Sequence, residues 1–251
     1  MQILISPAKK MRVDPETMAW RELPLLLPRT EQVLAALRRL RYPEARQLWA
    51  CSDAIAEPHY AALAHMDLRR NLTPALLAYQ GIQYQYLAPQ VLEAGAWAYL
   101  QEHLWILSGF YGLLRPLDGV VPYRLEMQAP LAVGEARDLY QFWGSSLAGI
   151  VTAEDPEVLN LASREYARSV EPWLGPSCRE VTCVFGELRD GRVIQKATQA
   201  KMARGEMVRF LAERQAASME EAKGFNRLDY CFCEELSTEN QWIFLKKCGK
   251  K

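Results

Sequence analysis

The apolar residues of this chain form two patterns, continuous runs typical of buried strands and a helical repeat typical of amphipathic helices. Residues 3–5 form a short continuous apolar run, which predicts a buried strand, and residues 158–161 form another. Large apolar side chains recur on one face over residues 138–151, which predicts an amphipathic helix. We expect further helices over 89–103 and 198–215, so strands and helices are interspersed along the chain.

The C-terminal part of the chain adds more strand-like segments. Two of them are separated by Asp190-Gly191, a dipeptide typical of a two-residue hairpin turn. The expected strands of this part are residues 181–185, 192–196, 230–232 and 242–245. Because the elements do not alternate regularly, the sequence favours one compact α+β domain over residues 1–251, of unusual mixed α/β architecture, over a doubly wound parallel sheet.

Composition and charge indicate a globular protein and limit its partners. Half of the 251 residues are hydrophobic and 24% are charged, which excludes a disordered chain. The 30 lysine and arginine residues balance 30 aspartate and glutamate residues, so binding of nucleic acid requires a local basic cleft. No apolar run approaches the ~20 residues of a membrane span, and the N-terminal run is too short for a signal peptide. We therefore expect a cytoplasmic protein that does not contact a membrane.

Residues that could bind a metal or a cofactor show no recognisable pattern. The three histidines and six cysteines have none of the spacings typical of zinc sites. Cys231 and Cys233 lie two apart in an expected strand, and we interpret them as buried free thiols. Neither a Walker loop nor a G-x-G-x-x-G motif occurs. The sequence thus predicts no metal and no cofactor.

A glycine-containing turn between two apolar runs is the first candidate binding element. It comprises Ser108, Gly109, Phe110, Tyr111 and Gly112, with Arg115 three residues further on. In a helix-hairpin-helix, backbone N–H groups beside such glycines approach a DNA phosphate, and a nearby arginine adds charge. An ordinary glycine turn inside the core explains the same spacing equally well. Residues 78–84 form a weaker second candidate for such a hairpin.

Together with Arg115, four basic residues at loops and on one helix face could form the required basic cleft. Lys9 follows the first expected strand, at the end where α/β proteins bind ligands. Arg124 and Glu126 lie two apart, so in extended chain they point the same way. Lys201 and Arg204 share one face of the helix expected over 198–215. Each of these residues, taken alone, is also explained by an ordinary solvated or ion-paired side chain.

Segments from one end of the chain to the other resemble the YaaA family. They are Ile5–Lys9, Leu107–Asp118, Pro122–Met127, Asp138–Gly144, Asn160–Ser163 with Glu165-Tyr166, Ala203–Gly205 with Met207 and Arg209-Phe210, and Gly224–Asn226. The resemblance implies a DNA-binding protein of unusual α/β fold with a helix-hairpin-helix and a positively charged cleft. It also implies a role in peroxide stress, in which members help to limit free intracellular iron and so protect DNA and proteins.

Three positions depart from the pattern of the family. Gln128 stands where the family usually has glycine, and Ser145 stands where it usually has aspartate. Gly81-Ile82-Gln83-Tyr84 replaces a Gly-Asp-Val-Tyr segment, so position 82 lacks an acid. The missing acids argue against a catalytic role at position 145 and against a role of the loop at 81–84.

The first hypothesis for the function is binding of double-stranded DNA, mainly through phosphate contacts. The residues expected to make these contacts are Lys9, Ser108, Gly109, Phe110, Tyr111, Gly112, Arg115, Arg124, Lys201 and Arg204. Such contacts carry little sequence information and weaken steeply with salt.

Direct binding of iron or another metal is a third possibility, for which the sequence offers no ligand cluster.

The second hypothesis is an enzyme that acts on a nucleotide or nucleic acid in a pocket lined by Lys9, Arg124, Glu126 and Lys201. Its basis is that a passive phosphate cleft has little use for Glu126 and for Glu165. Carboxylates that converge beside lysine or arginine suit acid–base chemistry or recognition of a small ligand. The two hypotheses are distinguished by whether these carboxylates meet Lys9 or Arg124 inside one pocket.

Overall fold

The computed structural model describes residues 1–246, and its centre is an eight-stranded mixed sheet. The strands follow in the order β11 (Tyr230–Cys233), β12 (Gln241–Lys246), β9 (Arg179–Arg189), β8 (Glu157–Asn160), β1 (Gln2–Ile5), β5 (Leu104–Ser108) and β6 (Gly112–Leu114), and β10 (Arg192–Ile194) pairs with β9. The five strands from β12 to β5 run parallel to one another. Two short ladders outside this sheet join β2 (Lys10–Met11) to β4 (Tyr79–Gln80) and β3 (Thr73–Pro74) to β7 (Gly119–Val120).

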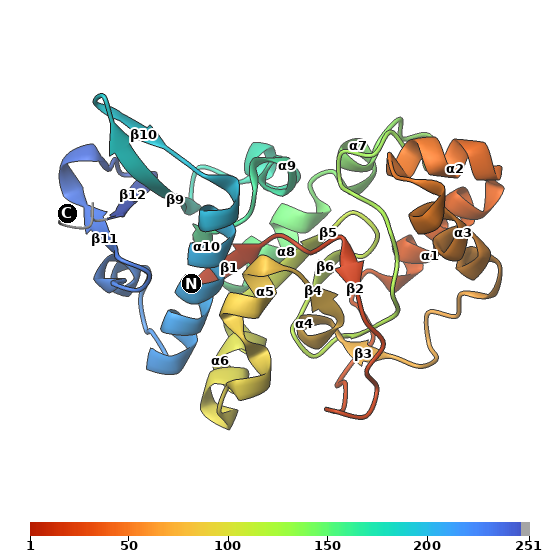
Figure 1. The fold of residues 1–251 in the computed structure, drawn as a ribbon, viewed down its shortest axis with the longest axis horizontal. Helices are drawn as coiled ribbons and strands as arrows, with labels where there is room; N and C mark the ends of the chain where they lie inside the picture. Colours follow the sequence, from red (N-terminus) through yellow and green to blue (C-terminus); the bar gives the residue numbers. More distant parts are fainter. Residues whose placement is uncertain (247–251) are drawn as a thin grey trace.

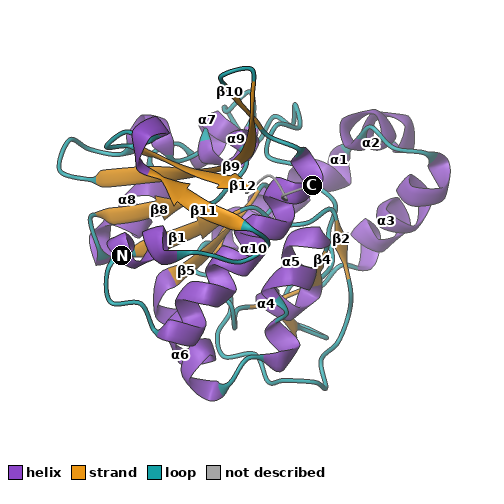
Figure 2. Cartoon of the chain, turned by 60° about the vertical axis from the view of Figure 1, so that its left-hand side comes forward, coloured by secondary structure: helices purple, strands orange, loops and turns teal. Residues whose placement is uncertain are grey.

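The helices lie on both faces of this sheet and at one end of the molecule (Figures 1 and 2). They are α1 (Leu27–Arg39), α2 (Tyr42–Trp49), α3 (Asp53–His65), α4 (Ala75–Ala78), α5 (Ile82–Leu87), α6 (Ala94–His103), α7 (Leu139–Trp143), α8 (Ser146–Glu154), α9 (Arg164–Ala167) and α10 (Ala197–Arg214). Short 3-10 helices cover Pro89–Val91, Glu171–Trp173, Met219–Gly224 and Glu234–Leu236. α6 and α10 lie on one face and α8 lies on the other, while α1 to α3 gather at one end of the molecule (Figures 1 and 2).

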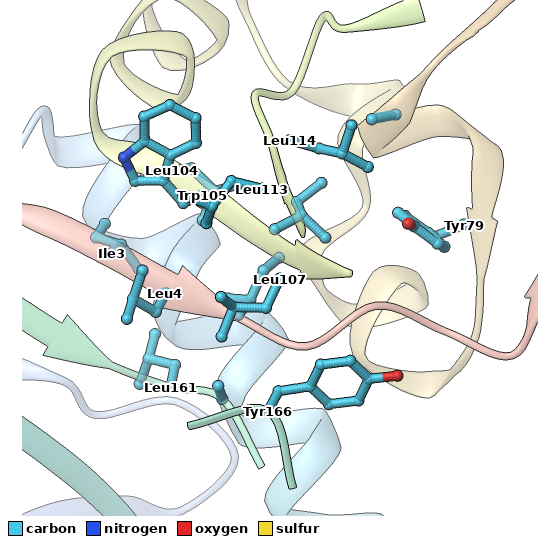
Figure 3. Packing of buried hydrophobic residues seen from close by; sticks show 14 of the residues in the cluster. Ile3, Leu4, Tyr79, Leu104, Trp105, Leu107, Leu113, Leu114, Leu161 and Tyr166 are labelled. Atoms are coloured by element: carbon cyan, nitrogen blue, oxygen red, sulfur yellow. The ribbon is translucent and has the colours of Figure 1, made fainter. Parts of the chain in front are cut away.

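The core follows from strands that are apolar on both faces. Ile3, Leu4 and Ile5 are fully buried, as expected for a central parallel strand between two helical layers. Leu4 of β1 and Leu107 of β5 lie among the packed side chains between these layers (Figure 3). Burial of each such side chain contributes roughly 1.5–3 kcal/mol relative to exposure. This core holds the ends of β1 and its neighbouring strands in fixed positions.

The expected α+β class is confirmed, and so are most of the elements. α10 begins and ends one residue before the expected helix, and Asp190-Gly191 turns β9 into β10 with both residues at positive φ. The helix expected over 138–151 is instead two helices, because Gly144 between them has φ 51° and ψ −141°, which interrupts the helical hydrogen bonds. The parallel character of the five central strands was missed, because the connection from β1 to β5 spans residues 6–103.

The helix-hairpin-helix prediction is wrong for the glycine turn. Residues 104–108 and 112–114 are the antiparallel strands β5 and β6, with Ser108 paired with Gly112. Gly112 has φ 74°, a left-handed conformation that glycine adopts readily. The apolar run before the turn is a buried strand, a distinction that its periodicity alone could not make.

Candidate functional site

A pocket of about 420 Å³ opens at the ends of β1 and β8. Ser6 follows β1 and Ser163 follows β8, and both line the pocket. The backbone N–H of Ser163 donates to Ser6 Oγ over 2.8 Å, and the Ser6 hydroxyl donates to Ser163 Oγ over 3.2 Å. On one side of β1 lies β5 and on the other side lies β8, so the strand order reverses here. In α/β sheets such a reversal at the carboxyl ends of the strands is the usual place for a ligand.

Segments far apart along the chain supply the walls of the pocket. They are the loop after β1, the start of α5, the extended residues 123–126, the start of α9 and the first half of α10. The pocket brings together four of the predicted residues, Lys9, Arg124, Lys201 and Arg204. It also contains Glu126 and Glu165, the carboxylates on which the enzyme hypothesis depends.

Close packing of α10 on α5 brings Lys201 and Arg204 to the pocket. Gly205 makes this contact possible, because a Cβ at this position would lie 2.1 Å from the backbone oxygen of Gln83 and 2.9 Å from the backbone nitrogen of Leu87. Backbone atoms cannot move aside as a flexible side chain can. The glycine therefore determines where the preceding turn of α10 meets the pocket.

The cations of the pocket differ in how they are neutralised. Lys9 Nζ lies 2.6 Å from Glu126 Oε1. Arg124, Lys201 and Arg204 make no ion pair within residues 1–246, and the Nε atoms of both arginines are buried without a hydrogen-bond acceptor there. Burial lowers the pKa of the Arg204 guanidinium, because it disfavours the charged form. Both arginines are half-buried, and a buried Nε without an acceptor is costly, so these two guanidinium groups are suited to an anion in the pocket.

Glu165 is a carboxyl group without a cationic partner among the described ion pairs. Burial raises its pKa most strongly, and the negative charge of Glu126 raises it further. The backbone N–H of Gln128, which donates to Glu165 Oε1 over 3.3 Å, and the charge of Lys9 act in the opposite direction. The balance leaves a group that can take up or release a proton closer to neutral pH than an ordinary glutamate.

The glycine turn supports the pocket from behind and does not face it. Ser108 Oγ accepts the backbone N–H groups of Phe110 (3.2 Å) and Tyr111 (2.9 Å), and it lies 2.7 Å from the hydroxyl of Tyr123, which lines the pocket. The Tyr123 hydroxyl also lies 2.8 Å from that of Tyr79, and burial raises the pKa of Tyr123 to about 12. Because the residues of the turn are buried, its backbone donors cannot reach a DNA phosphate.

Gly109 has a similar internal role. A Cβ there would lie 2.9 Å from the backbone carbonyl carbon of Glu126. Gly109 thus lets the pocket segment at 123–126 pass close to the turn, which explains its place in the motif without any contact to a ligand.

Arg115 lies apart from the pocket, so its assignment to the basic cleft is wrong. Its guanidinium is ion-paired with Glu154 and lies over the ring of Trp105, with 3.6 Å between Arg115 Cζ and the ring centroid. A further hydrogen bond of 2.9 Å runs from its Nη1 to the backbone oxygen of Glu102. These contacts use the side chain to fasten the β6–β7 connection to α6 and α8.

Sequence reasoning overlooked the part of the pocket formed by Gln83 and Tyr84. Both residues line the pocket and are buried, although the missing acid at position 82 argued against a role of this loop. The available signal was Gly81 before a short helical segment, which was interpreted only as a second hairpin candidate. The convergence of this loop with α10 is a tertiary contact that the local pattern does not contain.

Residues 1–246 provide neither a cluster of metal ligands nor a membrane-spanning helix. No group of three or more His, Cys, Asp or Glu side chains is placed there to hold a metal ion. The described helices include none with the length and apolar character required to cross a bilayer. Cys51, Cys178, Cys183, Cys231 and Cys233 are free thiols, and Cys248 lies outside the described residues. Cys231 and Cys233 are free as expected but half-buried, so the expectation that they are buried is wrong.

Comparison with known proteins identifies the family. The model of the family described as "Peroxide stress protein YaaA" matches residues 1–236. This chain belongs to the peroxide stress protein YaaA family. The resemblance noted in the sequence is thereby confirmed.

Relatives of the YaaA family match this chain over almost its whole length. A UPF0246 protein of Lachnoclostridium phytofermentans is 50% identical over 98% of this chain and 96% of its own length. A UPF0246 protein of Lactiplantibacillus plantarum is 51% identical, with 98% and 99% covered. A UPF0246 protein of Desulfitobacterium hafniense is 49% identical over the full length of both chains. The YaaA assignment therefore includes every segment that lines the pocket.

Proposed function

We propose that the pocket binds a phosphate-bearing ligand of nucleotide size. The observation that carries this proposal is the pair of guanidinium groups, Arg124 and Arg204, whose buried Nε atoms find no acceptor within residues 1–246. Guanidinium groups bind phosphate through parallel, charge-assisted hydrogen bonds. A volume of about 420 Å³ suits a small molecule.

The charge of the pocket favours a phosphate over a neutral ligand. Five cationic side chains line it, with Lys10 as the fifth, against the two carboxylates Glu126 and Glu165. The pocket is therefore positive although the chain as a whole is neutral. A positive pocket raises the local concentration of anions.

DNA binding takes a different form in this proposal from the one expected from the sequence. A duplex is too large for the pocket, so DNA would place a single nucleotide of a strand in it, as proteins that extrude a base do. A free nucleotide offers the same chemistry without the flanking strand. Limitation of free iron stays a prediction that rests on the family resemblance.

Titration of a purified Arg204→Gln variant tests the proposal. The ligands are inorganic phosphate, nucleoside monophosphates, a single-stranded oligonucleotide and a duplex. Calorimetry measures the affinity of each ligand for the unaltered protein and for the variant. Hydrogen bonds to a charged group contribute about 1.5–3 kcal/mol, so we expect affinity to fall roughly tenfold to a hundredfold. Affinity confined to the single strand would identify DNA as the source of the nucleotide, and affinity for monophosphates alone would identify a free nucleotide.

Arg209→Gln is the matched control. Arg209 lies on the same helix, pairs with Glu213 at 2.6 Å and does not line the pocket. Affinity should be unchanged in this variant. Equal losses in both variants, or no binding of any phosphate-bearing ligand to the unaltered protein, would contradict the proposal.

A second candidate function is acid–base catalysis on the bound ligand. The specific observation is that Glu165, without a cationic partner among the described ion pairs, shares the pocket with the Lys9–Glu126 pair. Two carboxyl groups with different environments are a common basis for an acid and a base in one site. Incubation with nucleotides and single-stranded DNA, followed by mass spectrometry, tests this function. Product formation that persists in Glu165→Gln would exclude Glu165 as the acid or base.

A further inference from the structure

We infer that the ligand carries a heterocyclic base and that Gln83 recognises it, an inference that rests on the proposed function. Gln83 lines the pocket and only 7% of its surface is exposed. Its amide nitrogen Nε2 is buried and has no hydrogen-bond partner within residues 1–246. A buried amide donor without an acceptor costs free energy, and a ligand in the pocket that offers an acceptor would remove that cost.

The position of this unpaired amide is informative because such groups are rare in folded proteins. Eight buried side-chain nitrogen or oxygen atoms lack a partner among the described residues, and three of them line this one pocket. Those three are Gln83 Nε2, Arg124 Nε and Arg204 Nε. The arginines provide the charge that a phosphate needs. A neutral amide, which offers a donor and an acceptor side by side, instead matches the edge of a base.

Packing keeps Gln83 at a constant position relative to the phosphate-binding arginines. Its backbone oxygen is the atom that a Cβ at Gly205 would meet at 2.1 Å, and Gly205 directly follows Arg204. At the other end of the loop, a Cβ on Gly81 would lie 3.1 Å from the Cβ of Ala8. The loop is thus held between α10 and the segment that follows β1.

Aromatic side chains also line this pocket. Tyr84, Tyr123 and Tyr166 line the pocket and are buried, and the Tyr84 hydroxyl donates to the backbone oxygen of Ser6 over 3.0 Å. The Tyr166 ring lies beyond the end of β1, where the chain leaves the sheet (Figure 3). Bases bound outside a duplex stack on such rings while their edges form hydrogen bonds. The pocket therefore combines a cationic part for phosphate with an amide and aromatic part for a base.

A comparison of ligands with and without a base tests this inference. Nucleoside monophosphates and ribose 5-phosphate are titrated into the unaltered protein, Gln83→Leu and Gln83→Glu. We expect the nucleotide to bind more tightly than the sugar phosphate, and Gln83→Leu to reduce nucleotide affinity by roughly tenfold or more with no change for ribose 5-phosphate. In Gln83→Glu, which keeps the shape but loses the donor, the preference among the four bases should change. Gln85→Leu, on the exposed side of the same helix, should leave all affinities unchanged.

The outcomes separate this inference from the proposed function. If nucleotide and ribose 5-phosphate bind equally, or if Gln83→Leu weakens both equally while Arg204→Gln still lowers affinity tenfold or more, the base-recognition inference is wrong and the phosphate site stands. If neither ligand binds, both proposals fail. A thermal unfolding midpoint for Gln83→Leu close to that of the unaltered protein shows that lost affinity is not lost folding.

Discussion

Individual side chains of the pocket acquire their properties from their surroundings, not from their type. Lys9 and Lys201 are both exposed lysines, but only Lys9 has a carboxylate within 2.6 Å. Glu126 and Glu165 are both glutamates, but only Glu126 has a cationic partner among the described ion pairs. Lys9 and Glu126 neutralise each other, whereas Lys201 and Glu165 have no such partner among the described ion pairs. The pocket therefore has both a free positive charge and a carboxyl group of raised pKa.

Ligand binding should depend on pH through Glu165. Burial raises the pKa of this carboxyl, so its proton remains bound to higher pH than in an ordinary glutamate. The protonated form carries no charge that would repel a phosphate. Affinity for a nucleotide should therefore increase as the pH falls through this pKa, as long as the phosphate keeps its own charge. Calorimetric titrations from pH 7.5 to about 5 measure the effect.

Glu165→Gln is the control for this pH dependence, because the amide imitates the protonated carboxyl at every pH. The variant should bind the nucleotide with nearly constant affinity over the range in which the unaltered protein changes. An identical pH profile in the two proteins would assign the titration to another group, such as the ligand phosphate.

Pairs of elements determine the geometry within which these side chains act. The contact of α10 with α5 depends on Gly205, and the passage of residues 123–126 depends on Gly109. In both cases the glycine is required because a backbone segment, which cannot move aside, occupies the space of a Cβ. Gly109 and Gly205 therefore report on packing around the pocket.

Gly205→Ala should separate α10 from α5 and damage the pocket. Overpacking of this kind costs roughly 1–3 kcal/mol, so we expect a lower free energy of unfolding in denaturant titration and weaker nucleotide binding. Gly149→Ala in α8 is the matched control, since nothing lies within 4 Å of a Cβ at that position. It should stabilise the protein by roughly 0.5–1 kcal/mol, as alanine does in a helix interior. A stable Gly205→Ala protein with full affinity would show that the contact can relax.

The molecule as a whole places the pocket by its strand order. β1 lies between β5 and β8, and the chain leaves β1 and β8 on the same edge of the sheet. A neutral chain thereby acquires a positive pocket, because five basic residues from distant segments gather at that edge while others, such as Arg115, pair elsewhere.

Salt dependence should be shallow if the pocket holds one phosphate group. The logarithm of affinity for single-stranded DNA falls by about 0.7 per neutralised phosphate for each tenfold rise in salt. We therefore expect a slope of about −0.7 for an oligonucleotide held through one phosphate group in the pocket. Fluorescence anisotropy at several salt concentrations measures this slope. A slope of −4 or steeper would indicate a broad electrostatic surface and would favour the duplex contacts first expected from the sequence.

The sequence by itself determined most of the elements, the fold class, the family and four of the cationic residues of the pocket. Periodicity and local turn preferences carry the elements, as at 3–5, 190–191 and 198–215, whereas the resemblance of motifs along the chain carries the family. Only the tertiary structure decided that Arg115 lies apart, that the turn at 108–112 is buried, and that Gln83 belongs to the pocket. The physical reason is that burial and charge pairing arise between segments distant along the chain, where no local pattern records them.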